Sequence, residues 1–427
     1  MTVDYGQPIE NKSIVDSNSS EKLRFGLSGN LQRLALVTGI AQFSMSVWAW
    51  QFGIFLQANV NHLWQIGITF SIGTFAMILG YAISGTLADY IGRKNVMLVA
   101  FIPMFSGLFA LRFFPVWPII PLEYATIQIG WAFILIMTSA MPADEIAQTS
   151  GENAARTFNM VVLPAFLIDG TSPIIAGFLL NAGYVAGDLH LLAAVGAIAA
   201  MVATRFGVRE SLGKDVIERA KAGSMIALRG LGRNFWIFVS GMFGFVFLMN
   251  FAFPYLGNLV VNEWGVSEPL YAIAWGGWSF TCVITMYGVG TATDRNIRFA
   301  LIAGLFSTAF VVGLYAYGHT FVDLLLVNIL LAMPIVVWSG AEKTLAVNGV
   351  SDEMKGRALG TYQFLMASTR LVGQFTGALL WDYFGSLRIV FGIASIAGMI
   401  LVIWVTYTLM TLRLEYRGEV QTLNGTE

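Results

Sequence analysis

Long apolar runs separated by short polar connections dominate the chain from about residue 31 to about residue 412. A membrane-spanning helix needs about 20 largely apolar residues. In lipid, only helices and closed barrels satisfy every backbone hydrogen bond. The runs therefore predict an all-α integral membrane protein with twelve transmembrane helices. The expected helices lie at about 31–56, 64–88, 95–114, 118–141, 156–180, 188–206, 234–261, 267–293, 297–317, 321–346, 357–380 and 387–412.

Polar stretches divide the chain into five parts. The longest one inside the apolar region, 207–233, predicts a linker between two six-helix bundles at 31–206 and 234–412. Residues 1–30 lack the apolar core of a cleaved signal peptide, so we expect a cytoplasmic N-terminal tail. Residues 413–427 are expected to form a second cytoplasmic tail.

Composition supports the membrane class and excludes several others. The chain is 56% hydrophobic and 11% charged, whereas a soluble domain carries about 25% charged residues. The formal net charge of −1 gives no indication of a nucleic-acid partner. A single cysteine, Cys282, excludes an intrachain disulfide and a cysteine metal cluster. We expect that the protein uses no cofactor or metal and is not an enzyme, because the sequence shows neither a nucleotide-binding loop nor a nucleophile–base constellation.

The positive charges predict the orientation in the membrane. All but three of the 24 Lys and Arg residues lie on the side that holds both termini and the linker. The exceptions are Arg112 and Arg388, in loops on the other side, and Arg370, within a helix. Basic residues are retained on the cytoplasmic side. The pattern therefore predicts a cell-membrane protein with both termini in the cytoplasm.

The two expected bundles repeat each other in sequence. GTLADYIGRKNVML corresponds to GTATDRNIRFALI, and ARTFNMVVLPAFLIDG corresponds to GRALGTYQFLMASTRL. The offset is 205 residues between Asp89 and Asp294, and 201 residues between Arg156 and Arg357. A parallel repeat of two six-helix units predicts pseudo-symmetric bundles with a substrate site at their interface, near the membrane midplane.

The first of these loops resembles the signature of the major facilitator superfamily, Gly-x-Leu-x-Asp-x-x-Gly-Arg-Lys. The matching residues are Gly85, Leu87, Asp89, Gly92, Arg93 and Lys94, and the second copy keeps Gly290, Asp294, Arg295 and Arg298. The resemblance implies a secondary transporter that works by alternating access on a small-molecule substrate, as a monomer in the lipid bilayer. VRES at 208–211 partly resembles the Pro-Glu-Ser of sugar porters, without its proline.

The loop charges predict an inner gate. Asp89 is expected to face the N-terminus of a helix in the other bundle, where free amides and the helix dipole favour a carboxylate. Arg93 and Lys94 can bind acidic groups or lipid phosphates. The alternative is that these are ordinary loop charges that follow the positive-inside bias. The predicted gate residues are Gly85, Asp89, Gly92, Arg93, Lys94, Arg156, Asp294, Arg295 and Arg357.

Ionisable residues inside membrane helices are costly, and they are functional by default. Asp169 and Arg370 each lie 13 residues beyond a loop arginine, Arg156 or Arg357. Thirteen residues of helix span about 20 Å, which places both near the middle of a core about 30 Å thick. The alternative is a structural ion pair, or two charges with unrelated partners. The predicted substrate and coupling residues are Gln42, Glu123, Asp169, Asn250, Asn328, Gln363, Arg370 and Gln374.

A midplane arginine favours an anionic substrate, because a guanidinium binds a carboxylate through two parallel hydrogen bonds. We therefore expect a proton-coupled symporter of a small organic solute, with a carboxylate favoured. An anion that competed with Asp169 for Arg370 would leave Asp169 to take up a proton. The alternatives are a proton-coupled exporter of drug-like or cationic compounds, which would use Asp169 and Glu123, and a sugar porter.

Overall fold

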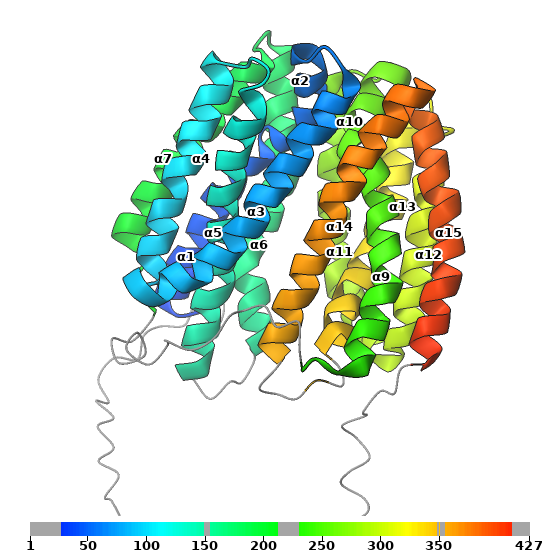
Figure 1. Ribbon diagram of the computed structural model, residues 1–427. Coiled ribbons are helices and arrows are strands. Elements are labelled where there is room, and N and C mark those ends of the chain that lie inside the picture. Colours follow the sequence, from blue (N-terminus) through cyan, green and yellow to red (C-terminus); the bar gives the residue numbers. More distant parts are fainter. Residues whose placement is uncertain (1–26, 149–153, 212–229, 348–349, 351–354, 412–427) are drawn as a thin grey trace, which may run out of the picture.

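The computed structural model describes residues 27–148, 154–211, 230–347, 350 and 355–411 (Figure 1). Within these residues the regular structure is helical and contains no β-strand. The first half contains α1 (Gly29–Ser46), η1 (Ala49–Gln51), α2 (Phe52–Asn59), α3 (Leu63–Ile91), α4 (Arg93–Phe113), α5 (Ile120–Gln148), α6 (Ala154–Asn181) and α7 (Ala186–Gly207). The second half contains α9 (Gly232–Ala252), η2 (Phe253–Tyr255), α10 (Leu256–Asn258), η3 (Leu259–Glu263), α11 (Glu268–Arg295), α12 (Ile297–Leu314), α13 (Phe321–Val347), α14 (Lys355–Phe384) and α15 (Leu387–Thr411).

The first helix of each half is interrupted towards the same end of the molecule. The expected helix at 31–56 is divided into α1, the 3₁₀ turn η1 and α2. The expected helix at 234–261 is divided into α9, the 3₁₀ turn η2, α10 and the π-helical turn η3. Pro254 accounts for the second interruption, because proline lacks an N–H and its ring crowds the preceding turn.

Nine helices in the described part are long and apolar enough to cross a membrane. The three remaining long segments are α1 with α2, α11 and α14. The expected count of twelve spans is therefore only partly reproduced.

Helix packing has the same pattern in both halves. In the first half, α3 and α4 pack on α5, α1 packs on α6, and α7 packs on α1 and α4. In the second half, α11 and α12 pack on α13, α9 packs on α14, and α15 packs on α9 and α12. The halves meet along two seams, one between α3 and α14 and the other between α6 and α11. An approximate two-fold axis relates one seam to the other. The predicted all-α fold with two pseudo-symmetric bundles is confirmed.

Contacts between the bundles close the end of the molecule that carries the connections at 60–62 and 264–267. Asn258 Nδ2 donates hydrogen bonds of 2.8 Å to Gly53 O and to Gln57 Oε1. Nearer the midplane, Ser71 Oγ donates to Leu371 O at 2.8 Å. In the orientation that the positive charges predict, this closed end is the external one.

Candidate functional site

A cavity of about 460 Å³ lies between the two bundles, below their closed end. The first bundle contributes side chains from α3 and α5, and the second contributes side chains from α9, α11, α13 and α14. Four residues predicted from the sequence line this central cavity: Asn250, Asn328, Arg370 and Gln374.

Arg370 carries the one formal charge in the lining of the central cavity. Its half-buried guanidinium forms no ion pair and no hydrogen bond with another described residue. Glu342 influences Arg370 through space, while its carboxylate accepts a hydrogen bond of 2.8 Å from Tyr362 Oη. A positive charge in a membrane cavity with no direct ion pair or hydrogen bond is costly, so an anion that entered the cavity would be stabilised at Arg370.

The amides around Arg370 differ in how free they are. Gln374, one helical turn further along α14, accepts a hydrogen bond of 2.8 Å from Thr74 Oγ1 of α3. Asn250 Nδ2 donates to a backbone carbonyl of its own helix at 2.8 Å. Both polar atoms of the Asn328 side chain are engaged, because it accepts from Tyr315 Oη at 2.5 Å and donates to Ala274 O at 2.9 Å. Gln374 and Asn250 therefore retain free amide atoms for a bound molecule, and Asn328 shapes the wall.

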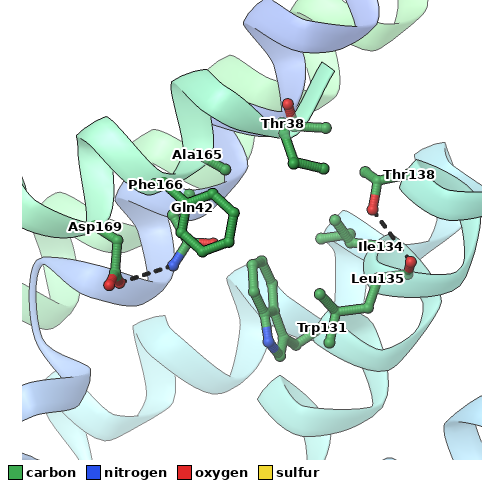
Figure 2. Close-up of a pocket in the computed structure, with 10 residues that line it drawn as sticks. Thr38, Gln42, Trp131, Ile134, Leu135, Thr138, Ala165, Phe166 and Asp169 are labelled. Carbon is green, nitrogen blue, oxygen red and sulfur yellow. Dashed lines mark hydrogen bonds between the residues drawn. The ribbon is translucent and has the colours of Figure 1, made fainter. Parts of the chain in front are cut away.

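Asp169 lies in a different cavity, of about 270 Å³, within the first bundle between α1, α5 and α6 (Figure 2). Its Oδ1 accepts hydrogen bonds from Gln42 Nε2 at 3.0 Å and from Ser46 Oγ at 2.5 Å. Its Oδ2 accepts from Ser279 Oγ of α11, in the second bundle, at 2.9 Å. Three donors stabilise the ionised carboxylate, and one of them crosses the seam between the bundles.

Asp169 and Arg370 do not pair. The expected competition for the guanidinium requires contact, and among the described residues the two side chains form no ion pair. The reason is the two-fold relation between the bundles. Equivalent helices lie at opposite seams, so α6 contacts α11 while α14 contacts α3. Equal depth in the membrane therefore places the two charges apart, and the direct exchange is wrong for this conformation.

Two further predicted residues line neither of these two cavities. Glu123 is buried in the first turn of α5, and neither of its carboxylate oxygens has a hydrogen-bond partner among the described residues. Gln363 is half-buried on α14.

The signature loop between α3 and α4 is held within the first bundle. Arg93 forms an ion pair with Asp144 of α5, with Nη2 donating to Oδ1 at 3.0 Å. The backbone N–H groups of Arg93 and Lys94 donate to the Glu210 carboxylate at 3.0 and 3.1 Å. Gly92, at φ +86°, lies directly against that carboxylate. Glu210 therefore satisfies free backbone amides at the start of α4; the sequence analysis missed this residue, although it lies in the VRES segment.

The remaining gate residues stay predictions. The side chains of Asp89, Arg156, Asp294, Arg295 and Arg357 lie outside the described part of the structure. Gly85 is half-buried on α3. Most of the linker and both tails also lie outside it, so the expected domain boundaries remain predictions.

Comparison with known proteins gives distant relatives and a shared fold. No protein-family model matches the sequence. The enterobactin exporters EntS of Salmonella typhi and Salmonella typhimurium are each 24% identical over 365 residues, covering 82% of this chain and 84% of the relative. A mutant of the nucleoside transporter NupG superposes with a TM-score of 0.76 at 13% identity, covering 88% of this chain and 99% of that chain. For the human organic anion transporter MFSD10 the TM-score is 0.62 at 14% identity, covering 88% and 98%. The chain therefore has the fold of the major facilitator superfamily, as its loop signature indicated.

Proposed function

We propose that the protein is a secondary transporter that moves an organic anion across the membrane together with a proton. The observation that carries this proposal is the guanidinium of Arg370, which lines the cavity between the bundles without a bonding partner among the described residues. A midplane arginine with no structural partner is retained at a large cost in lipid. That cost is offset when a carboxylate binds there.

Arg370 and Gln374 together form the proposed anion site. They are four residues apart on α14, so they share one face of the helix. The guanidinium offers two parallel donors to a carboxylate, and the Gln374 side-chain nitrogen forms no hydrogen bond with another described residue. A carboxylate at this position would be linked to the first bundle indirectly, because Thr74 of α3 donates a hydrogen bond to Gln374.

Asp169 is the proposed proton site. As an ionised group it accepts hydrogen bonds on both oxygens, and Ser279 provides the one that reaches the second bundle. Protonation turns one oxygen into a donor, so it changes this link between the bundles. Anion and proton would then be coupled because each alters the relative stability of the same two arrangements of the bundles. No direct contact between Asp169 and Arg370 is needed.

The closed outer end gives the proposed cycle its starting state. The central cavity lies below the contact that joins Asn258 to Gln57 at the closed end, and the bond from Ser71 to Leu371 lies beside the cavity at the α3–α14 seam. For external access these contacts must break and the inner ends of the bundles must approach each other. Alternating access of this kind is the plan of transporters built from two parallel repeats.

Export of a hydrophobic cation is the second candidate function. The cavity around Asp169 combines a carboxylate with the apolar side chains of Trp131, Ile134 and Phe166 (Figure 2). This combination suits an ammonium group attached to an apolar body. EntS, the relative at 24% identity, is named as an exporter. An exporter of cations has no use for the unpaired charge of Arg370, and we therefore place this candidate second.

Uptake into proteoliposomes with an imposed pH gradient tests the proposal. Organic acids, sugars and hydrophobic cations are offered to the wild type, Arg370→Gln, Arg370→Lys and the control Arg233→Gln, whose arginine is exposed on α9. We expect proton-driven uptake of an organic acid. A bond between charged groups contributes about 1.5–3 kcal/mol, so Arg370→Gln should lose roughly 10- to 100-fold in affinity. Arg370→Lys should recover little, because an ammonium lacks the planar fork. Normal acid uptake by Arg370→Gln, with cation uptake that depends on Asp169, would favour the exporter.

A further inference from the structure

We propose that a groove on the outer surface of the second bundle binds an anionic phospholipid. The groove has a volume of about 690 Å³ and lies between the first turns of α9 and the last turns of α15. Both helix ends are at the end of the molecule opposite α2 and α10 (Figure 1). In the orientation that the positive charges predict, the groove therefore opens at the cytoplasmic surface of the membrane.

The groove faces the bilayer and lies outside the substrate path. Helix α15 contributes no side chain to the described lining of the central cavity, so its exposed residues lie on the outside of the bundle. On α9, Ile237 lines the groove and Val246 lines the central cavity. The two residues are nine positions apart, which corresponds to about two and a half helical turns. They therefore lie on opposite faces of α9, and the inference is independent of the substrate that the central cavity binds.

The packing of α9 against α15 explains why a groove forms at this end. A Cβ added at Gly241 of α9 would lie 2.6 Å from Thr408 Oγ1 of α15, and one added at Gly244 would lie 2.8 Å from Leu401 Cδ1. The two helices are therefore in close contact at these glycines. Towards the start of α9, larger side chains replace the glycines, and the groove opens between the helices.

Arg233 gives the groove its positive charge. Its exposed guanidinium forms no ion pair and no hydrogen bond with another described residue. No Asp or Glu is among the described residues that line the groove. A guanidinium presents a planar set of donors that fits the oxygens of a phosphate. Basic pockets between membrane helices on the cytoplasmic side bind anionic lipid headgroups, and the charge of this groove complements such a headgroup.

The other end of the groove is apolar. Trp404 and Tyr407 are exposed, and their ring centroids lie 5.6 Å apart with the planes at 28°. Both also line an adjoining groove of about 560 Å³, together with Ile400 and Ile403. Tryptophan and tyrosine are enriched where headgroups meet acyl chains. From Thr411 to Ile400 the two grooves extend about 16 Å along α15, which matches one leaflet of a hydrocarbon core about 30 Å thick.

A phospholipid is the occupant that fits both ends of the groove. Its phosphate would lie at Arg233, at the membrane surface, while an acyl chain would follow Trp404 and Ile400 into the bilayer. Inorganic phosphate would use the charged end alone. Residues 413–427 follow α15 in the chain, but their apolar residues are single ones between polar neighbours. They offer no continuous apolar stretch for the inner end of the groove.

Native mass spectrometry of the full-length, detergent-purified protein tests this site. Phosphatidylglycerol and phosphatidylcholine with identical acyl chains are titrated separately, and the affinity of the first retained lipid is compared. We expect the wild type to bind phosphatidylglycerol roughly fivefold more tightly, the effect of one basic side chain near an anionic headgroup. Arg233→Gln should abolish this preference. Trp404→Ala should weaken the binding of both lipids and keep the preference, because it removes apolar contact and leaves the charge.

Arg205→Gln is the matched control, because Arg205 is also exposed, near the end of α7 in the other bundle. It should keep the affinities of the wild type for both lipids. An excess of inorganic phosphate should not displace the bound lipid.

Four outcomes would overturn the inference. Equal binding of the two lipids to the wild type, or a preference that survives Arg233→Gln, would exclude Arg233 as a headgroup site. An equal loss in Arg205→Gln would show a general effect of surface charge. Displacement by inorganic phosphate would mean that the apolar end of the groove contributes nothing. Failure of the wild type to retain either lipid would mean that the groove is not a lipid site.

Discussion

Ser279 on α11 donates a hydrogen bond of 2.9 Å to Asp169 on α6, so a membrane-embedded carboxylate joins the two bundles at one seam. The other seam carries a polar bond of its own, from Thr74 of α3 to Gln374 of α14 at 2.8 Å. Arg370 lies one helical turn from Gln374 on the same face. The two ionisable groups of the repeat are thus each adjacent to a bond that crosses between the bundles, at opposite seams.

This arrangement predicts what removal of the charge at Asp169 does. Asp169→Asn should abolish accumulation of substrate driven by a pH gradient, because an amide cannot take up the proton. Exchange of substrate across the membrane should persist, since Arg370 and Gln374 are unchanged. Counterflow and gradient-driven uptake in the same proteoliposomes separate the two activities. Ser279→Ala is the companion variant, in which a protonatable Asp169 remains while its bond to the second bundle is lost. We expect weakened coupling with exchange retained. Uphill accumulation by Asp169→Asn would remove this residue from the coupling.

Glu123 provides a contrasting carboxylate. Both of its oxygens are buried without a hydrogen-bond partner among the described residues, and an ionised carboxylate in that setting is strongly destabilised. We therefore expect Glu123 to be uncharged while it is buried in this way. Glu123→Gln, which has the shape of the neutral acid, should retain gradient-driven accumulation. A loss of accumulation in Glu123→Gln as complete as in Asp169→Asn would instead identify Glu123 as a second proton carrier.

The fold class was predictable because membrane-spanning helices require long apolar segments, which can be read directly from the sequence. Runs of about 20 apolar residues give the spans, and the GTLADYIGRK loop occurs between the second and third of them. The interruption between Ser46 and Phe52 was not predicted, whereas the one between Ala252 and Leu256 coincides with Pro254, a helix-interrupting residue that the sequence does show. Hydropathy does not register a break in hydrogen bonding when the residues at the break are as apolar as the helix around them.

The sequence predicted how deep in the membrane Asp169 and Arg370 lie, but not which neighbouring helices their side chains face. Counting residues from Arg156 and Arg357 gives how far Asp169 and Arg370 lie from the membrane surface, because the rise per residue of a helix is constant. Which neighbouring helix each side chain faces depends on how the helices pack, which linear spacing does not contain. Ser279 was missed for the same reason, since a serine in an apolar helix becomes notable only when a carboxylate approaches it.

The orientation of the chain is tested by labelling with membrane-impermeant maleimide in a Cys282→Ala background. Cys282 is buried, so its replacement leaves the surface unchanged. Single cysteines at His62, Ala182 and Ser267, which are exposed in connections between helices, should react from outside intact cells. A cysteine at position 221, in the predicted linker, should react only after permeabilisation. Labelling of position 221 from outside would reverse the proposed topology.

Gly67 of α3 packs closely against α14 near the closed outer end. A side chain added there should therefore change the balance between the two states of the cycle. A Cβ added at Gly67 of α3 would lie 2.5 Å from Ala378 Cβ and 3.2 Å from Gln374 O of α14. Backbone at that distance cannot move aside without separating the helices, so Gly67→Ala should favour opening of the outer end. Spin labels at the exposed positions Asn61 and Ser267, at the outer ends of the two bundles, should report a longer distance in the variant. Gly392→Ala is the control, because a Cβ there meets nothing within 4 Å, and its distance distribution should match the wild type. If the distance distribution of Gly67→Ala matched that of the wild type, the α3–α14 seam would not limit opening. A shift confined to Gly67→Ala, accompanied by slower exchange of substrate, would identify this seam as part of the outer gate.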